Sequence, residues 1–213
     1  MNRIRRALTA LPTRLGFPLY IDGYKVYAPS NPWYIYREIF HFKDYHFDGL
    51  PQSPVIYDVG ANIGLATFYF KHLRPDATIY AFEPSSETFR YLAVNTEHLD
   101  KVNLYKVAIA ATAGEVELFA GGSGKASIVR GKGISETVRT EPLTFPEIDL
   151  LKMDIEGAEY SVIPDLHKRG ILKNAKRVAI EIHGEPSGIL SYFNDFRLIE
   201  RNANVWKFVR KAI

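Results

Sequence analysis

The sequence contains no cysteine, and only two methionines and two tryptophans occur in its 213 residues. Without cysteine the chain can form neither a disulfide nor a metal site built on thiolates, and a reducing compartment suits it. It also lacks an uninterrupted apolar run of about 18 residues, the length that a membrane-spanning helix needs. We therefore predict a cytoplasmic protein without a membrane span.

The sequence has little excess of either charge. Its 27 lysines and arginines outnumber its 24 aspartates and glutamates by three. So small an excess gives no electrostatic reason for a nucleic-acid partner, and none is expected. With 46% hydrophobic and 24% charged residues, the composition is that of a globular domain large enough to bury a core.

The N-terminal segment, "MNRIRRALTALPTRLGF", begins like a signal peptide but does not continue like one. Its short apolar run is broken by Thr9, Pro12 and Arg14. Its apolar residues would share one face of a helix. We expect a short arm that docks on the domain, with a peripheral contact to a membrane or to an anionic substrate as the alternative.

From residue 55 onward, short apolar strands alternate with amphipathic helices. We expect strands at 55–59, 77–83, 102–109, 115–120, 147–155 and 177–183, and helices at 63–73, 86–99 and from about 156 to 170, the last interrupted or restarted at Pro164. This alternation predicts a parallel, doubly wound sheet with both faces covered. The final stretch, "FRLIERNANVWKFVR", predicts an antiparallel hairpin. Before residue 55 we expect a strand at 24–28 and a short helix after Asn31 and Pro32.

The stretch "VIYDVGANIG" ends its strand in an acid and places Gly60 and Gly64 around an asparagine. In an open parallel sheet, ligands bind beyond the carboxyl ends of the strands, where the strand order reverses. The two glycines would let the backbone pass close to a ligand and enter the next helix without a Cβ clash. A tight strand-to-helix turn without a ligand is the alternative.

A second acid, Glu83, stands at the tip of the next expected strand, nineteen residues after Gly64. A carboxylate there can accept two hydrogen bonds from the 2′,3′-diol of a ribose, which indicates a nucleoside ligand. The alternative is an exposed surface glutamate.

The turn itself narrows the choice of nucleoside. It has the form G-x-N-x-G instead of G-x-G-x-x-G, so the pyrophosphate grip of a NAD site is missing. A phosphate-binding G-x-x-x-x-G-K-[ST] loop is also missing, because Ala126 follows Gly124 and Lys125. The loop suits a ribose with a small zwitterionic tail, as in S-adenosylmethionine. Asp58 could face the amino group of that tail or cap the turn. The expected cofactor-binding residues are Asp58, Gly60, Asn62, Gly64, Glu83 and Pro84.

Four segments in this order and spacing, "DVGANIG", "AFEPSSETFRYLAVNTE", "LLKMDIEGAEYSVI" and "RVAIEIHG", resemble the FkbM-type methyltransferases. "DVGANIG" alone is shared by several methyltransferase families, and its combination with "KMDIEGAE" is more specific. The resemblance implies a Rossmann-like class I methyltransferase fold with a mainly parallel seven-stranded sheet. It also implies S-adenosylmethionine as cofactor and O-methylation of a hydroxyl on a small molecule, sugar or glycan. Residues 51–213 would be the methyltransferase domain, and residues 1–50 an arm and a cover over the cofactor pocket, in one globular unit.

Titratable side chains gather at the tips of the fourth and fifth main strands. If the fourth strand persists, Lys152, Asp154 and Glu156 alternate onto one face of it, and two further groups share a face of the fifth. The expected catalytic residues are Asp154, His183 and Glu181, as an acid-base group. The alternative is that Lys152 only neutralises buried carboxylates and that Glu156 and Glu159 cap the next helix. Oxygen ligands could hold Mg²⁺ here, but no spacing rule compels it, and no metal is predicted.

Other functions stay open as alternatives. An RNA methyltransferase is one, although the asparagine-proline motif of base-amino methylation is replaced by "DIEG" after the fourth strand. A cofactor-binding protein without catalysis is another, and a NAD-dependent oxidoreductase is disfavoured by the loop sequence. The Gly-rich stretch at 121–133 predicts a flexible loop, with a substrate lid carrying Lys125, Arg130 and Lys132 as the alternative.

Overall fold

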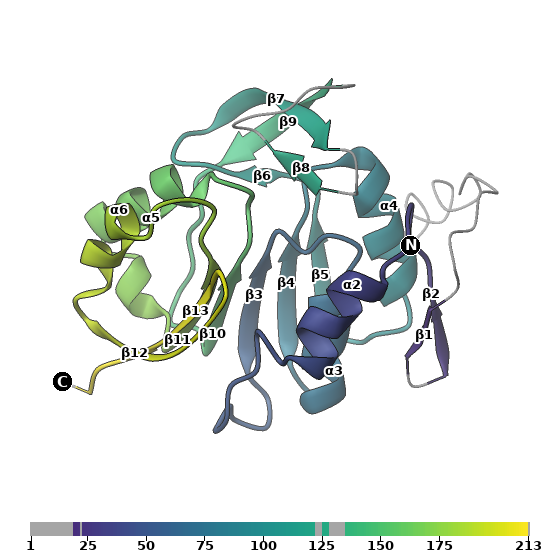
Figure 1. Cartoon of the computed structure of the whole chain (residues 1–213), viewed down its shortest axis with the longest axis horizontal. Coiled ribbons are helices and arrows are strands. Elements are labelled where there is room, and N and C mark those ends of the chain that lie inside the picture. The colour runs from purple at the N-terminus through teal and green to yellow at the C-terminus, as the bar shows by residue number, and fades with distance from the viewer. Residues whose placement is uncertain (1–18, 22, 122–124, 128–134, 213) are drawn as a thin grey trace.

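The computed structural model of the chain (Figure 1) describes residues 19–21, 23–121, 125–127 and 135–212. The N-terminal arm up to residue 18 and most of the Gly-rich stretch lie outside the described residues, so the predictions made for them remain predictions. Within the described part of the chain, every helix is too short or too polar to cross a membrane.

Seven strands form the central sheet: β3 (Val55–Val59), β4 (Thr78–Phe82), β5 (Val102–Tyr105), β10 (Leu150–Met153), β11 (Arg177–Glu181), β12 (Phe196–Asn202) and β13 (Val205–Arg210). Their order is β12-β13-β11-β10-β3-β4-β5. From β11 to β5 all neighbours are parallel, whereas β13 is antiparallel to both β11 and β12. The predicted class of fold, a mainly parallel seven-stranded sheet with a C-terminal antiparallel hairpin, is confirmed. The chain order reverses between β3 and β10, which is where a ligand is expected.

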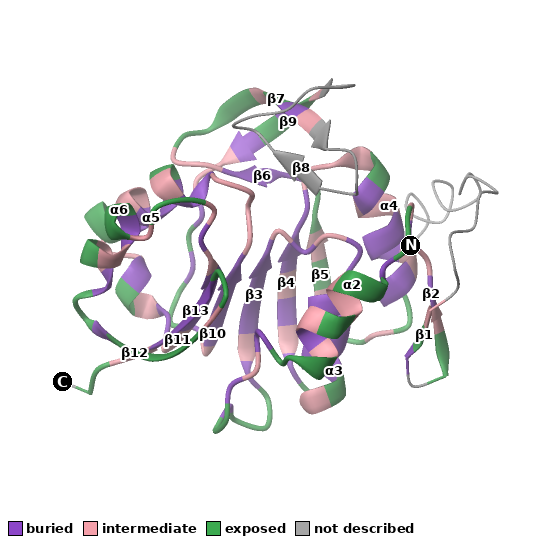
Figure 2. Ribbon diagram, in the orientation of Figure 1, coloured by how far each residue is buried: buried purple, intermediate pink, exposed green. Residues whose placement is uncertain are grey.

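Helices cover both faces of this sheet (Figure 1). They are α2 (Trp33–Tyr36), the π-helix η2 (Arg37–His41), α3 (Leu65–Leu73), α4 (Ser86–Thr96), α5 (Glu159–Lys168), the 3₁₀-helix η3 (Leu172–Asn174), α6 (Ser187–Leu190) and the 3₁₀-helix η4 (Ser191–Phe193). Successive strand residues point to opposite faces, so Ile56 packs with α3 and α4, whereas Tyr57 packs with α5. Figure 2 shows the strands of the sheet and the inward sides of the long helices as buried.

A second, four-stranded sheet lies across the top of Figure 1 and was only partly predicted. It consists of β6 (Ala108–Ile109), β7 (Gly114–Gly121), β8 (Lys125–Ser127) and β9 (Ser135–Glu141), in the order β6-β9-β7-β8. The expectation of one strand over 102–109 is wrong, because β5 pairs with β4 while β6 pairs with β9. The sequence stays apolar across the junction, so periodicity alone does not reveal the change of sheet. Part of the expected loop at 121–133 is also a strand, β8.

Two further differences concern local structure. The expected first strand is a hairpin of β1 (Leu19–Ile21) and β2 (Tyr24–Val26), and the Asn31 carboxamide oxygen does accept the N–H of Trp33 at 3.0 Å before α2. Helix α5 runs through Pro164, so the interruption expected there is wrong. Proline removes one N–H donor, and the buried side chains of Ile163 and Leu166 around it hold the helix in place.

Candidate active site

The turn after β3 lies against the end of β10. Gly60 has a φ of +80°, and a Cβ on it would lie 1.7 Å from the carbonyl oxygen of Asp154. The N–H groups of Gly60 and Ala61 both donate to the carbonyl of Phe82, at 3.0 and 2.9 Å. Glycine is therefore required at position 60 by the neighbouring chain as well as by the left-handed backbone.

Gly64 is required by a different neighbour. Its φ is +93°, and a Cβ on it would lie 2.9 Å from Leu92 Cδ1 and 3.1 Å from Thr96 Cγ2. Both contacts belong to α4, so this glycine lets α3 begin close to α4. The alternative reading of the motif, a tight turn without a ligand, is enough to explain why position 64 is glycine. That Gly64 belongs to a cofactor site stays a prediction.

Asp58 is wholly buried beneath the turn. Its Oδ2 accepts the Thr67 hydroxyl at 2.7 Å, and its Oδ1 lies 3.2 Å from Lys152 Nζ. Lys152 also donates to the carbonyl of Gly60 at 2.7 Å. Burial alone would lower the pKa of Lys152, but the carboxylates of Asp58 and Asp154 outweigh it and raise that pKa. The ammonium group of Lys152 is thus charged and fixes the turn. This agrees with the alternative given above, in which Lys152 neutralises buried carboxylates.

Glu83 follows β4 and is also buried, with its two oxygens each held by one backbone group. Oε2 accepts the N–H of Asn62 at 3.0 Å, and Oε1 accepts that of Ser85 at 2.9 Å. Asn62 sits in the left-handed region with φ +51°, where its own side chain accepts the N–H of Ile63. Burial raises the pKa of Glu83 to about 7 in spite of these bonds. Each oxygen keeps a second lone pair for a ligand hydroxyl.

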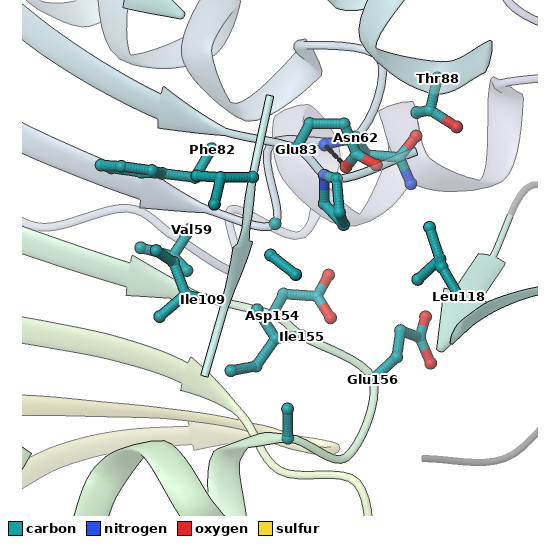
Figure 3. Close-up of a pocket in the computed structure, with 15 residues that line it drawn as sticks. Val59, Asn62, Phe82, Glu83, Thr88, Ile109, Leu118, Asp154, Ile155 and Glu156 are labelled. Carbon is teal, nitrogen blue, oxygen red and sulfur yellow. Dashed lines mark hydrogen bonds between the residues drawn. The ribbon is translucent and has the colours of Figure 1, made fainter. Parts of the chain in front are cut away.

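A cavity with about 630 Å³ of empty space opens beside Glu83. Figure 3 shows Glu83 and Asn62 on one side of it and Asp154 and Glu156 on the other. Its apolar lining consists of Val59, Phe82, Pro84, Val107, Ala108, Ile109, Leu118, Ile155 and Ala158. A carboxylate next to an apolar slot is what a nucleoside needs, with the ribose on the acid and the base between apolar side chains.

A second and larger cavity, with about 1790 Å³ of empty space, lies on the other side of the same turn. Its walls come from residues 28–45, from residues 202–205 and from the tips of β3, β10 and β11. The residues that line both cavities are Gly60, Asn62, Asp154 and Glu156. The two cavities therefore meet at the point where the strand order reverses.

The chain after β10 does not extend the strand. β10 ends at Met153, and the chain turns at Glu156 and Gly157, whose φ angles are +52° and +104°. The expectation that a continuing strand would place Lys152, Asp154 and Glu156 on one face is therefore wrong in its geometry. Asp154 and Glu156 nevertheless line both cavities, because the turn brings the second carboxylate back toward the first.

His183 lies just beyond β11, and its ring is held by a buried glutamate. Glu159 Oε1 lies 3.0 Å from His183 Nδ1 and also accepts the N–H of Ile155, while its Oε2 accepts the N–H of Gly157 at 2.8 Å. Glu159 thus accepts backbone N–H groups as the capping alternative supposes, although they belong to the turn before α5. Its side chain is completely buried.

The other ring nitrogen of His183 faces three carboxylates. Nε2 lies 3.4 Å from Glu156 Oε2, 3.4 Å from Glu181 Oε1 and 3.8 Å from Asp154 Oδ1. Nε2 and Asp154 Oδ1 are both buried, and neither has a hydrogen-bond partner among the described residues. This group of four side chains, Asp154, Glu156, Glu181 and His183, is called the strand-tip cluster below.

The charges of the strand-tip cluster shift one another's protonation. Burial raises the pKa of Asp154 to about 7, with Lys152 opposing the shift and Glu181 adding to it. Burial disfavours the charged ring of His183, but the neighbouring carboxylates, those of Glu159 and Glu181 above all, raise its pKa to about 10. An imidazole among several carboxylates stays protonated for this reason.

The structure brings Asp154, Glu181 and His183 together at two adjacent strand tips, and places Gly60, Asn62, Glu83 and Pro84 on a cavity wall. Asp58 is enclosed and Gly64 packs on α4, and neither residue lines either of the two cavities. Sequence analysis missed Glu159 as the partner of His183. The one signal for Glu159 was its position at the start of an expected helix, which indicated only a cap. Sequence analysis also missed the part that residues 202–205 and the small sheet play in the cavity walls, and no motif pointed to either.

Comparison with known proteins gives a consistent picture. The sequence profile of the methyltransferase FkbM domain matches residues 58–205. Methyltransferase SdnD of Sordaria araneosa is 31% identical over 214 residues, which cover 79% of this chain and 82% of SdnD. The 2-O-methyltransferase NoeI of Sinorhizobium fredii is 32% identical over 137 residues, which cover 52% of this chain and 56% of NoeI.

Among solved structures, the methyltransferase FkbM of Methylobacillus flagellatus superposes with a TM-score of 0.57 at 17% identity. The match covers 84% of this chain and 50% of that one. At this level of identity the likeness concerns the fold. By the coverages of these matches, the chain spans about half the length of NoeI and of the Methylobacillus protein, and most of the length of SdnD.

Proposed function

The chain belongs to the FkbM methyltransferase family, and we propose that it transfers the methyl group of S-adenosylmethionine to a hydroxyl oxygen of a small molecule, sugar or glycan. The observation that carries the proposal is the junction of the two cavities. A nucleoside held by Glu83 in the first cavity would direct its sulfonium methyl group past Gly60 and Asn62 into the second. The strand-tip cluster stands at that junction.

In this proposal the cofactor occupies the smaller cavity. Glu83 accepts both ribose hydroxyls, the adenine lies among apolar side chains such as Pro84 and Leu118, and the methionine tail runs along the turn at Gly60. Asp58 acts through Lys152, whose ammonium group holds the carbonyl of Gly60. It is thus a positioning residue.

Methyl transfer needs an oxygen held in line with the sulfur–carbon bond, and removal of the hydroxyl proton. The new C–O bond forms as the S–C bond breaks, and the neutral thioether S-adenosylhomocysteine leaves. We assign Asp154, Glu181 and His183 the task of promoting loss of that proton. They are the titratable groups closest to the junction, and a pKa near 7 suits Asp154 to proton exchange at neutral pH.

The larger cavity would receive the acceptor. Five carboxylates line it, from Glu38, Asp44, Asp154, Glu156 and Glu181, and Lys152 is the one lysine or arginine among its described lining residues. Such a surface repels phosphates and favours neutral hydroxyl-rich acceptors, which argues against a nucleic-acid substrate. The name of NoeI supports oxygen as the acceptor atom in a related protein. Residues before 51 form part of this wall, so we propose one globular unit in which they cover the site.

Two measurements test the function. Calorimetric titration with S-adenosylmethionine should show one binding site, and Asp154→Asn should retain it. Incubation with methyl-labelled cofactor and a panel of neutral glycosides, amino sugars, hexuronates and bulk RNA should label a hydroxyl of a neutral acceptor, as identified by mass spectrometry. A protein that binds no S-adenosylmethionine, or one that labels RNA in preference to every small acceptor, contradicts the proposal.

A further inference from the structure

In the strand-tip cluster, three candidate ligand atoms lie around a fourth. Three are carboxylate oxygens and one is the imidazole Nε2 of His183, which lies 3.4–3.8 Å from each of the oxygens. Two ligands bound to a metal ion at about 2.1 Å, with a right angle or a tetrahedral angle between them, lie about 3.0–3.4 Å apart. The separations from Nε2 are therefore close to those of atoms that share an ion.

The ring of His183 is held as a metal ligand is held. Glu159 fixes the Nδ1 side of the ring, and Glu159 is itself fixed by the N–H groups of Ile155 and Gly157. A carboxylate that accepts Nδ1–H orients the imidazole, and a divalent cation can then displace the proton from Nε2 and bind there. Here the Nε2 atom is buried, and it points at carboxylate oxygens that offer no proton when ionised.

Two buried atoms of the cluster point the same way. Asp154 Oδ1 and His183 Nε2 are buried and have no partner in the part of the chain that the structure describes. Buried polar atoms are nearly always satisfied, and each one left without a partner has a free-energy cost. A cation between them would satisfy both atoms at once.

We propose that Asp154, Glu156, Glu181 and His183 bind one divalent metal ion at the wall between the two cavities. The donor set of carboxylate oxygens with one imidazole nitrogen suits Mn²⁺ and Mg²⁺ through its oxygens and Zn²⁺ or Fe²⁺ through its nitrogen. Asp154, Glu156 and Glu181 line the larger cavity, so the ion would be open to an acceptor hydroxyl on that side.

The ion's part in catalysis rests on the proposed function, whereas its binding does not. A hydroxyl oxygen that coordinates a divalent cation gives up its proton to water more readily. The resulting alkoxide oxygen forms the C–O bond while the S–C bond of the cofactor breaks, so charge and atoms balance. The residues of the cluster then promote proton loss as ligands of the ion.

The test uses the full chain without cofactor or acceptor, and Mn²⁺ as the probe. Electron paramagnetic resonance of free Mn²⁺ should show one ion bound per chain, displaced by excess Mg²⁺ or Zn²⁺. Pulsed measurements on the bound ion should show coupling to an imidazole nitrogen. Asp154→Asn should weaken binding at least tenfold, His183→Gln should also abolish the nitrogen coupling, and Glu159→Gln should weaken binding about 10–100-fold through the orientation of the ring.

Glu185→Gln is the matched control, because it removes an exposed carboxylate two residues from His183 and should leave Mn²⁺ affinity unchanged. Thermal melting of each variant shows whether it folds, and the nitrogen coupling of the unsubstituted chain decides the question without any variant. Absence of stoichiometric Mn²⁺ and Zn²⁺ binding overturns the proposal, as does bound Mn²⁺ without nitrogen coupling. If the ion binds but S-adenosylmethionine does not, the proposed function fails and the metal site stands.

Discussion

The β4 side and the β10–β11 side of the two cavities, called the two walls below, satisfy their carboxylates in different ways. On the β4 side, Glu83 is buried, and each of its oxygens accepts a backbone N–H. On the β10 and β11 side, the carboxylates of Asp154 and Glu181 face the ring of His183 and one another, and Asp154 Oδ1 has no hydrogen-bond partner among the described residues. The carboxylate of the first wall has a hydrogen bond on each oxygen, whereas the second wall keeps a buried carboxylate oxygen that a ligand or an ion could bind.

This difference separates rigid recognition from chemistry. A carboxylate fixed by the backbone keeps one geometry, which suits a part of a ligand that does not change during a reaction. Asp154 Oδ1 and His183 Nε2, which have no hydrogen-bond partner among the described residues, are available to a proton, a cation or a reacting atom. We therefore expect substitutions on the β4 side to change cofactor affinity and those on the other side to change turnover.

The largest effect should come from Asp154→Asn, which keeps the shape of the side chain and removes its charge. Single-turnover methyl transfer at saturating cofactor should fall about 10²–10⁴-fold, because the group that promotes proton loss is impaired. Cofactor affinity measured by calorimetry should change little. Near-normal turnover, or an equal loss in affinity, would erase the distinction between the walls.

Gly60→Ala tests the point where the two walls touch. The new Cβ would overlap the Asp154 carbonyl oxygen, so we expect a loss of about 3 kcal/mol or more in the free energy of unfolding. Gly23→Ala is the matched control: its φ is +84°, but no atom lies within 4 Å of its Cβ position, so only the backbone cost of about 1 kcal/mol remains. Equal losses in urea unfolding of the two variants would show that backbone strain alone governs both glycines.

Glu83→Gln tests the recognition wall alone. It removes the charge that strengthens two ribose hydrogen bonds and should weaken S-adenosylmethionine binding by about 1.5–3 kcal/mol. Glu87→Gln, which removes an exposed carboxylate four residues along in the first turn of α4, should leave affinity unchanged. Turnover of Glu83→Gln at saturating cofactor should stay within a few-fold of the original. If a folded Glu83→Gln protein bound S-adenosylmethionine with unchanged affinity, the assignment of Glu83 to the ribose would be wrong.

The smallest effect concerns pH. Because burial raises the pKa of Glu83 to about 7, its carboxylate form, which accepts both hydroxyls, is lost as the pH falls through 7. The dissociation constant for S-adenosylmethionine should then rise about tenfold between pH 8 and pH 6. In the free protein the sign is opposite, since a raised pKa adds stability that is lost as the pH rises through 7. A pH profile of binding that persists in Glu83→Gln would assign the titration to another group.

Much of the central fold could be predicted from the sequence. Buried strands such as Val55–Val59 and the helices between them carry strong periodic patterns, and the order of the sheet follows from that alternation. The small sheet could not be predicted in full, because Ala108–Ile109 change partner without any change in composition. Strand β9 (Ser135–Glu141) gave no signal, since its alternation is made mostly of polar and charged residues.

The sequence predicted which side chains meet at the strand tips better than it predicted their geometry. Strand tips placed Asp154 and His183 near each other, because parallel strands end at one edge. The left-handed turn at Glu156 is invisible in a pattern that assumes a continuing strand. Gly64 shows a different limit. Glycine is required there because a Cβ would meet Leu92 of α4, and a local sequence motif carries no information on such a contact between helices.

The walls of the larger cavity include residues 28–45 and residues 202–205 besides the tips of β3, β10 and β11, whereas the smaller cavity is walled from the middle of the chain alone. On the proposed assignment, the middle of the chain binds the cofactor, and residues near the two ends help to bind the acceptor. Recombination near either terminus could thus alter which acceptor is methylated and leave the cofactor site untouched. For the engineer, the ends are where a library aimed at new acceptors belongs.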